Sequence, residues 1–291
     1  MSAPGAKKSL EEILHAVDTL PSLPKAVIEI MRTIDDPEAS ATTLAKQIET
    51  DLGLLTSVLR LVNSSRYTAR GSVSTASQAV VLLGFNVIRN LVCAVGVADY
   101  FQKNGASSFD YEQFLRHSAG VGSIAKSLAT HVGMSPDTTF VAGMLHDLGQ
   151  LALAATLPDE YRMVMDHQML HGCHISEAEQ AVIGMDHSHI GAHLARLWHL
   201  PEEICEAIER HHQTPEDYAP SSPMADLVHV SEVLAHALEL GTSGQVPLLS
   251  EGAMHRIGLS MLQIKQSFGR IEEEYGDILQ MMGPSGTHQQ A

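Results

Sequence analysis

The sequence predicts an all-α protein, and three observations lead to this expectation. Nearly every stretch places apolar residues at helical intervals, and no long run alternates with the period of two that marks a strand. Apolar residues make up 44% of the chain but aromatic residues only 4%, so Leu, Ala, Val, Ile and Met must build the core. That composition suits packed helices better than sheets, which favour aromatic and β-branched side chains. Finally, proline and glycine stand where helices should begin and end.

Residues 1–106 predict an N-terminal helical bundle. Pro24 suits a first helical turn, where its missing N–H costs nothing. Ser40 or Thr42 can cap the next helix, and Gly84 is a typical residue at a helix C-terminus. A linker is expected at KNGASS, residues 103–108. The expected helices lie at 23–34, 40–51, 52–67, 74–84 and 85–101.

Residues 107–282 predict a second helical unit. Pro158, Pro201 and Pro223 each stand where a helix should start. The last residues, 283–291, are expected to be a disordered tail. The expected helical stretches are 114–132, 138–156, 158–169, 176–184, 187–199, 201–212, 223–240 and 261–279.

Charge and histidine are distributed unevenly between these two units. Residues 1–106 hold ten Lys or Arg and ten Asp or Glu, whereas residues 107–291 hold eight and twenty-four and carry the whole net charge of −16. Of the 17 histidines, 15 fall between His117 and His255. An acidic surface argues against nonspecific nucleic-acid binding, which needs clustered Lys and Arg to neutralise phosphates. It is compatible with a site that holds cations.

The sequence does not support a membrane protein, a cysteine-based site or a dinucleotide-binding site. The N-terminus has no apolar run of signal-peptide type, and no segment approaches 18 uninterrupted apolar residues, so we expect a cytoplasmic protein without membrane contact. The three cysteines have no CxxC spacing and form neither a disulfide framework nor a zinc knuckle. GVGSIA, residues 120–125, matches a dinucleotide-binding pattern but lacks a preceding strand. Gly120 and Gly122 are better explained by close helix packing.

The remaining signal is an ordered set of histidines and acids. His146 and Asp147 are adjacent in an otherwise apolar stretch, and the other members are expected near the middle of successive helices. Imidazole and carboxylate ligands without thiolate suit Fe, Mn, Zn or Mg. Since neighbouring residues on a helix diverge by about 100°, Asp147 can bridge two ions while His146 binds one. The candidate metal ligands are His117, His146, Asp147, His187, His211, His212 and Glu232.

A simpler interpretation competes with this one for each residue taken alone. A single helical histidine is most often a half-buried polar residue, and a His-Asp doublet can be a salt-bridged pair. Seven histidines have no partner in the proposed scheme and are expected to be structural or exposed, and three more remain open. The first set is His131, His167, His171, His174, His199, His236 and His255, and the second is His189, His193 and His229.

The order His…His-Asp…His…His-His…acid resembles the HD superfamily of metal-dependent phosphohydrolases, related to the HD-GYP phosphodiesterases. The passages LPSLPKAV, SVSTASQAVVLLGFNVIRNLV and FVAGMLHDLGQLAL resemble, more closely, the HDOD family of bacterial signalling output domains. The resemblance covers roughly residues 15–240. It implies an N-terminal helical bundle packed on a C-terminal HD-like domain, with one or two divalent metal ions.

Compared with the HD-GYP phosphodiesterases, this sequence departs from the family pattern at positions that concern catalysis. Glu232 stands where the phosphodiesterases have aspartate, and Gln150 stands where they have a lysine suited to hold a phosphate. The Gly-Tyr-Pro loop expected after His212 is replaced by QTPEDYAP. We therefore expect a metal-binding signalling domain that acts through contacts with other signalling proteins. A phosphohydrolase acting on a nucleotide or cyclic dinucleotide, with His146 and Asp147 as catalytic residues, is the alternative, and a metal-free helical adaptor is a third interpretation.

Overall fold

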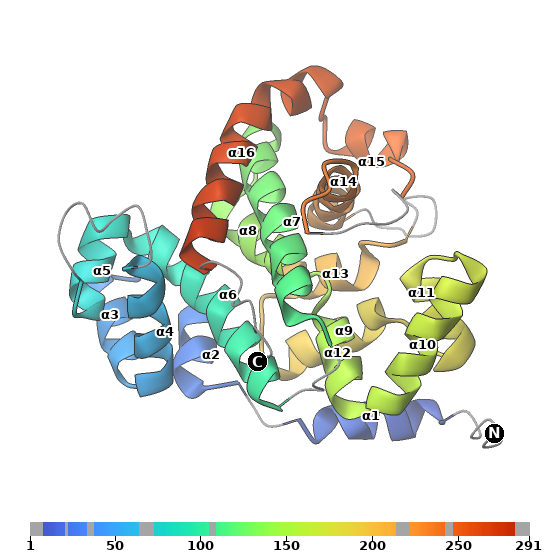
Figure 1. Cartoon of the computed structure of the whole chain (residues 1–291). Helices are drawn as coiled ribbons and strands as arrows, with labels where there is room; N and C mark the ends of the chain where they lie inside the picture. Colours follow the sequence, from blue (N-terminus) through green and yellow to red (C-terminus); the bar gives the residue numbers. More distant parts are fainter. Residues whose placement is uncertain are drawn as a thin grey trace, which may run out of the picture.

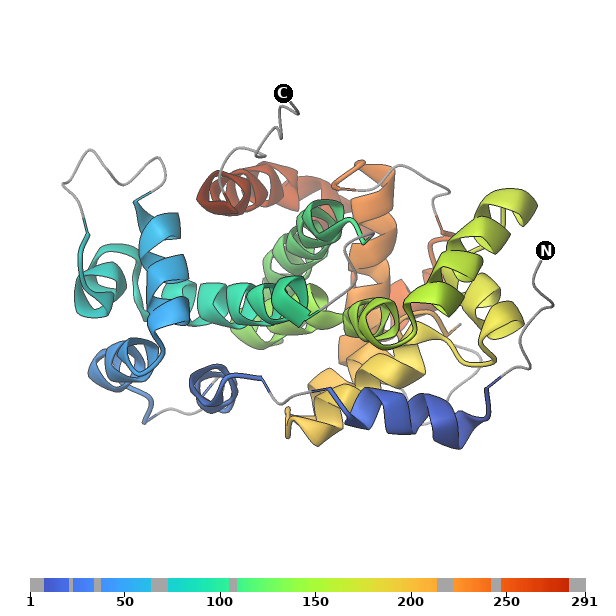
Figure 2. The ribbon, with the colours of Figure 1, turned by 60° about the horizontal axis from the view of Figure 1, so that its bottom comes forward.

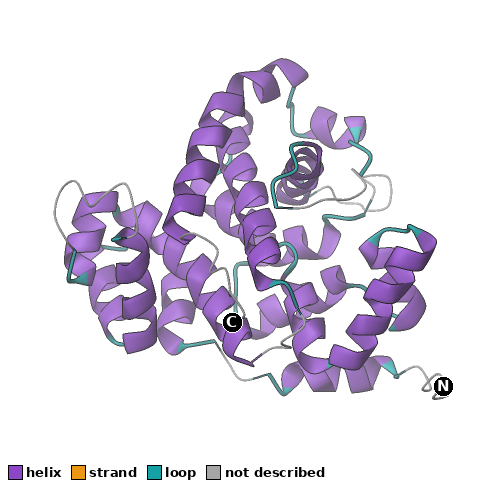
Figure 3. Ribbon diagram, viewed as in Figure 1, coloured by secondary structure: helices purple, strands orange, loops and turns teal. Residues whose placement is uncertain are grey.

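The computed structural model describes residues 8–20, 23–33, 38–63, 73–104, 109–213, 222–241 and 247–282. Within these ranges every regular element is a helix (Figure 3). The all-α prediction is therefore confirmed. Among the helices that the structure describes, none has both the length and the apolar character needed to cross a bilayer by itself.

Helices α2 to α6 form the N-terminal bundle, and α3, α4 and α5 lie together at one end of the molecule (Figure 1). Helix α1 lies apart from them, against α9 (Leu148–Thr156) and α12 (His187–Leu197) of the second unit (Figure 2). The bounds are α1 (Leu10–Asp18), α2 (Lys25–Met31), α3 (Ala41–Glu49), α4 (Leu52–Val62), α5 (Ala76–Leu83) and α6 (Phe85–Asn104).

Helices α7 to α16 form the second unit, in which α16 runs along α7, and α10 and α11 lie at the end far from α3, α4 and α5 (Figure 1). The bounds are α7 (Tyr111–Val132), α8 (Pro136–Leu145), α9 (Leu148–Thr156), α10 (Pro158–His171), α11 (Ile175–Val182), α12 (His187–Leu197), α13 (Glu202–Arg210), α14 (Pro223–Ala237), α15 (Glu251–Arg256) and α16 (Met261–Met282).

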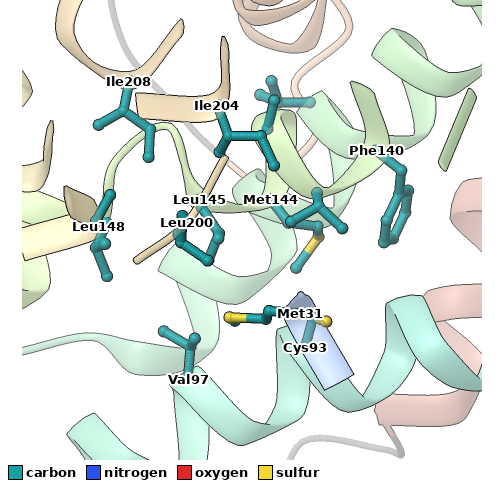
Figure 4. Close-up of a cluster of buried hydrophobic side chains, with 14 of the residues drawn as sticks. Met31, Cys93, Val97, Phe140, Met144, Leu145, Leu148, Leu200, Ile204 and Ile208 are labelled. Atoms are coloured by element: carbon teal, nitrogen blue, oxygen red, sulfur yellow. The ribbon is translucent and has the colours of Figure 1, made fainter. Parts of the chain in front are cut away.

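One apolar core joins the two units. Met31 of α2 and Cys93 of α6 approach Met144 of α8, and the side chains of α13 lie on the other side of α8 (Figure 4). Because this core is continuous, the packing of the N-terminal bundle fixes the position of α8, which leads directly into the His146–Asp147 pair.

Glycines allow the helices around that pair to approach closely. A Cβ on Gly143 would lie 2.8 Å from the Cα of Gly122, so α8 crosses α7 with backbones nearly in contact. A Cβ on Gly149 would overlap the main-chain oxygen of His187 and lie 2.7 Å from the nitrogen of Gly191. Close packing was the interpretation given to Gly122 from the sequence, and it is confirmed. The crossing at Gly149 places the start of α12 beside the start of α9.

The stretch 138–156 was expected to be one helix, and this was wrong. Helix α8 ends at Leu145 with His146 as its C-cap, and α9 begins after Asp147. Asp147 has φ −96° and ψ 16°, outside the helical region, so the backbone changes direction there. Helices α1 and α15 were not expected, and α4 ends at Val62 rather than at 67.

The other boundaries follow the sequence closely. Ser40, rather than Thr42, caps α3 by accepting a hydrogen bond from the Thr43 amide. Gly84 ends α5 with a φ of 91°, as its role at a helix end requires. Residues 103 and 104 of the expected linker belong to α6. Residues 105–108, the expected tail 283–291 and most of the QTPEDYAP segment lie outside the described residues. The division at residue 106 stays a prediction.

Candidate metal centre

The seven predicted ligands come together in the second unit. They form two donor groups, and within each group the ligand atoms lie within 4.8 Å of one another. The first donor group is Asp147, His187, His211 and His212, and the second donor group is His117, His146 and Glu232.

Most of these side chains project from helix ends, and the expectation that they lie near helix centres was wrong for five of the seven. His117 and Glu232 lie within α7 and α14, as expected. His187 is the first residue of α12, and His211 is the C-cap of α13 with His212 next to it. Helix ends of separate elements can meet at a point without a clash between helix bodies, which explains how so many donors converge.

Asp147 lies between the imidazoles of three histidines. Its Oδ1 is 3.0 Å from Nε2 of His187 and 3.6 Å from Nε2 of His211, while its Oδ2 is 3.3 Å from Nε2 of His146. Two ligand atoms on one ion, each about 2.1 Å from it, lie roughly 3.0–3.4 Å apart. The separations of 3.0 and 3.3 Å therefore match the spacing of ligands around a shared cation, and the separation of 3.6 Å is slightly longer.

The opposite ring nitrogen of each of these histidines is already bound. Nδ1 of His146 donates to the Gly143 carbonyl at 2.8 Å, and Nδ1 of His211 donates to the Ile208 carbonyl at 2.7 Å. Nδ1 of His187 lies 2.6 Å from Oε2 of Glu179. In a neutral imidazole a proton fixed on Nδ1 leaves a lone pair on Nε2. All three histidines thus direct Nε2 toward Asp147, in the orientation that binds metal once Nε2 carries no proton.

Unpartnered buried atoms show that a cation fits this centre. Nε2 of His146, Nε2 of His211 and Nδ1 of His117 are buried and have no hydrogen-bond partner among the described residues. Buried polar atoms are nearly always paired, and unpaired imidazole nitrogens in a cluster with carboxylates are the atoms that a bound cation would satisfy. The residues present therefore fit divalent cations bound by imidazole and carboxylate.

The electrostatics of Asp147 and its neighbours are those of a charged group held by cations. Burial opposes its ionisation, but His146 and His187 outweigh this effect and hold the pKa of Asp147 well below its usual range. Burial likewise opposes a charge on His187, yet Glu179 and Asp147 raise the pKa of His187 well above its usual value. Protons on these imidazoles thus occupy the position that a metal ion would take.

The remaining histidine ligands are neutral. Burial lowers the pKa of His117 to about 3 and that of His211 to about 4, and it lowers the pKa of His212 well below the usual value. Burial also raises the pKa of Glu232 to about 8. Neutral imidazoles are ready to bind a cation, whereas Glu232 must release a proton to do so.

Two residues outside the predicted ligand set position the ligands, and sequence reasoning missed the first of them. Glu179 of α11 is fully buried, and its Oε2 accepts the backbone N–H of His187 at 2.7 Å in addition to contacting its ring. The signal was an acid on the buried face of α11 beside Ala178, where an apolar side chain is expected. His229, which the sequence left open, lies with its Nδ1 2.9 Å from the His211 carbonyl and donates to it.

Two histidines expected to lack a partner adjoin the centre, so that expectation was wrong for them. His174 packs edge-on against His212 with ring centroids 4.6 Å apart, and it forms a third possible donor group with His212 and Glu232. His236 lies 4.9 Å from the ring of His117, and its Nε2 is 4.0 Å from Glu232. His236 follows Glu232 by one helical turn of α14, a spacing that the sequence contains, whereas the α10–α11 turn that brings His174 here is not encoded in local periodicity.

The other histidines lie away from the donor groups. His189 is bound to Asp186 at the start of α12, and His193 contacts Asp18 of α1. His131 is bound to Ser267 of α16. These contacts agree with a structural or surface role.

A cavity of about 740 Å³ adjoins the centre. Asp147, His212 and Glu232 line it from the side of the donor groups, and residues of α10 and α11 contribute to its lining. Gln150 is also in the lining, where its Oε1 accepts the hydroxyl of Tyr161 at 3.2 Å. Within the described residues, Arg162 is the one Lys or Arg among the lining side chains.

Comparisons with known proteins agree with this architecture. The model of the HDOD domain matches residues 20–214. A solved HDOD-domain protein of unknown function from Geobacter sulfurreducens superposes with a TM-score of 0.70 at 25% identity, covering 94% of each chain. A Shewanella amazonensis protein with a provisional assignment as a phosphohydrolase superposes with a TM-score of 0.73 at 24% identity, covering 92% of this chain and 96% of that one, and shares the fold.

Similarity to curated proteins covers only parts of them. An uncharacterized protein from Treponema pallidum is 28% identical over 220 residues, which are 73% of this chain and 42% of that protein. Ribonuclease Y from Lawsonia intracellularis is 31% identical over 126 residues, which are 43% of this chain and 19% of that enzyme. This chain thus spans less than half the length of both relatives. Because the family model matches more than half of the chain and the fold agrees with a solved HDOD protein, the chain belongs to the HDOD family.

Proposed function

We propose that this protein is a metal-binding signalling domain that holds two divalent cations, binds a phosphate-containing ligand beside them and acts through contacts with other proteins. The observation that carries the proposal is the convergence of three Nε2 atoms on Asp147. Each of these histidines has its other ring nitrogen fixed by a carbonyl or carboxylate oxygen. Such an arrangement fixes the orientation of each ring, with Nε2 toward Asp147, before any metal arrives.

The two donor groups would hold one cation each. Asp147 lies within reach of both groups and would bridge them, since its two oxygens face different histidines. The imidazole-rich set suits Fe, Mn or Zn better than Mg, which prefers oxygen ligands. When bound, such a pair of cations supplies charge neutralisation to a phosphoryl group and activation of a water molecule.

The cavity beside the centre supports a ligand of moderate size. Phe109, Phe114 and Tyr161 form an aromatic wall, with ring centroids of Phe109 5.7 Å and 6.0 Å from those of the other two. Ligand sites commonly combine an apolar wall with a few polar groups in a volume of about 300–1,000 Å³. A phosphate ester with an organic group, such as a nucleotide, has this combination of chemistry.

The side chains around the cavity favour binding over rapid turnover. Gln150 is neutral and already accepts a hydrogen bond from Tyr161, so it offers a phosphate no charge. Losing one group that stabilises the transition state typically lowers the rate by about 10²–10³-fold. The regulatory function is therefore the first candidate. The phosphohydrolase is the second candidate, because the set of metal-ligand types is complete.

RNA is a weaker candidate ligand, although ribonuclease Y is among the relatives. The net charge of −16 repels a polyanion, and the described lining of the cavity includes a single arginine and no lysine. A small phosphate ester requires far fewer cationic contacts than a nucleic-acid strand.

Turnover assays on metal-loaded protein separate the two candidate functions. Wild type and Asp147→Ala, each supplied with Mn or Fe, are assayed on cyclic dinucleotides, mononucleotides and a short RNA. We expect little or no turnover by either protein, together with metal-dependent binding of a phosphate ester by the wild type. Robust wild-type turnover that Asp147→Ala abolishes would contradict the regulatory function and establish an enzyme.

A further inference from the structure

His174 occupies a position at the centre that its place in the sequence did not reveal. It follows the turn after α10 and is the N-cap of α11. Its ring lies against that of His212, at 4.6 Å between centroids and 74° between planes. It also lines the cavity, so a ligand seated beside His212 would contact it.

The hydrogen bonds of His174 determine which ring nitrogen can act on a ligand. Nδ1 accepts the backbone N–H of Ser176 at 3.4 Å as the helix cap, and lies 2.9 Å from the hydroxyl of the same residue. When Nδ1 accepts, the proton of a neutral imidazole lies on Nε2. Nε2 has no hydrogen-bond partner within the described part of the chain, so His174 offers a donor.

A donor at this position suits an anion better than a third cation. His174, His212 and Glu232 have ligand atoms within 4.8 Å of one another, which by itself would also permit a metal ion. However, metal binding through Nε2 would require the proton to move to Nδ1 and would break the helix cap. His212 and Glu232 also already belong to the first and second donor groups.

We propose that His174 donates its Nε2–H to a phosphoryl oxygen of the ligand held at the metal centre. In this position it supplies a donor from the α11 side of the cavity, whereas Gln150, also in the lining, offers only an uncharged amide. The inference rests on the proposed function, since the phosphate is placed by the two donor groups. His174 is thus a binding residue that the α10–α11 turn contributes.

The test uses His174→Asn in the Mn-loaded full chain, with inorganic phosphate as the probe. Asn is a favourable N-cap, so it keeps the start of α11 while its shorter side chain lacks the ring donor. His171→Ala is the matched control, because His171 ends α10 on the exposed surface outside the cavity lining. Phosphate affinity is measured by calorimetry, Mn content by elemental analysis, and folding by thermal melting.

We expect His174→Asn to weaken phosphate binding by about 10- to 100-fold, the value of one hydrogen bond to a charged group. Its Mn content and the affinity of His171→Ala should equal those of the wild type. Unchanged phosphate affinity in His174→Asn overturns the inference, and so does a wild type that binds Mn but no phosphate. Loss of one Mn per chain in the variant also overturns it and makes His174 a metal ligand. His174→Ser, a second variant with a capping side chain, gives the same readouts should the first not fold.

A failure of the proposed function itself looks different. Wild-type protein that takes up no Mn contradicts the metal centre before His174 is tested. Normal Mn uptake with normal phosphate binding in His174→Asn leaves the proposed function intact and removes only this inference.

Discussion

Asp147→Ala should release both metal ions, because Asp147 is the residue that connects the two donor groups. Oδ1 is 3.0 Å from Nε2 of His187 in the first donor group, and Oδ2 is 3.3 Å from Nε2 of His146 in the second. Alanine removes the oxygens that face both sides. It also removes the negative charge that attracts a cation, whether a proton or a metal ion, to these imidazoles.

The size of the effect follows from the position of Asp147. Replacing a residue that only supports a metal ligand typically weakens metal binding by about 10- to 100-fold. Asp147 is placed to contact both ions directly, so each site should lose more than about 100-fold in affinity, or about 2.7 kcal/mol. No single substitution elsewhere in the two donor groups should affect both sites to this extent.

The assay is metal content after dialysis against a chelator of known affinity. Asp159→Ala is the control, because Asp159 has a side chain 85% exposed and lies outside both donor groups. Circular dichroism in the chelator checks that the metal-free variant keeps its helices. Two ions retained by Asp147→Ala at wild-type affinity would refute the bridging role.

Four further predictions follow from the same geometry. Glu179→Gln should weaken the site that contains His187 by about 10- to 100-fold and leave the other unchanged in a two-site chelator titration, since Glu179 holds the His187 ring. Equal loss at both sites would contradict this. Verified metal removal should lower the melting temperature by about 8 °C or more, because an ion at a thousand times its Kd contributes about 4 kcal/mol; an unchanged melting curve would count against a buried centre. Because nearby carboxylates raise the pKa of His187 and of His146 against the effect of burial, both rings carry protons before metal binds, so metal affinity should increase with pH and fall as pH drops. Calorimetry in buffers of different ionisation enthalpy checks this, and metal uptake without proton release would disprove it. Gly149→Ala should destabilise the fold by about 1–3 kcal/mol or more in denaturant melts, because its methyl group would overlap the His187 carbonyl. Gly276→Ala in α16 is the control: its methyl group would meet no atom within 4 Å, so this variant should be neutral or stabilising.

The sequence contained most of the ligand set but not its geometry. Residue type and order sufficed to select His117, the His146–Asp147 pair and the later histidines, since few other roles suit so many imidazoles beside carboxylates. Helical periodicity also sufficed for the fold class. The break between α8 and α9 was not predictable from this pattern, because Leu145 and Leu148 continue the apolar spacing across it.

Contacts between distant elements were beyond any local pattern. Glu179 holds His187 across eight residues, and His174 meets His212 only through the α10–α11 turn. Glu179 could in principle be found from the sequence, because a carboxylate on a buried helix face indicates a buried partner. His174 gave no such signal, since a histidine at the start of a helix is common on protein surfaces.

The two-cation centre is tested most directly by elemental analysis of protein purified without a histidine tag, combined with anomalous scattering from its crystals. We expect close to two transition-metal ions per chain, with one anomalous peak among Asp147, His187, His211 and His212 and another among Asp147, His117, His146 and Glu232. Protein that holds no metal above background at neutral pH, even after incubation with Mn, Fe and Zn, would contradict the account.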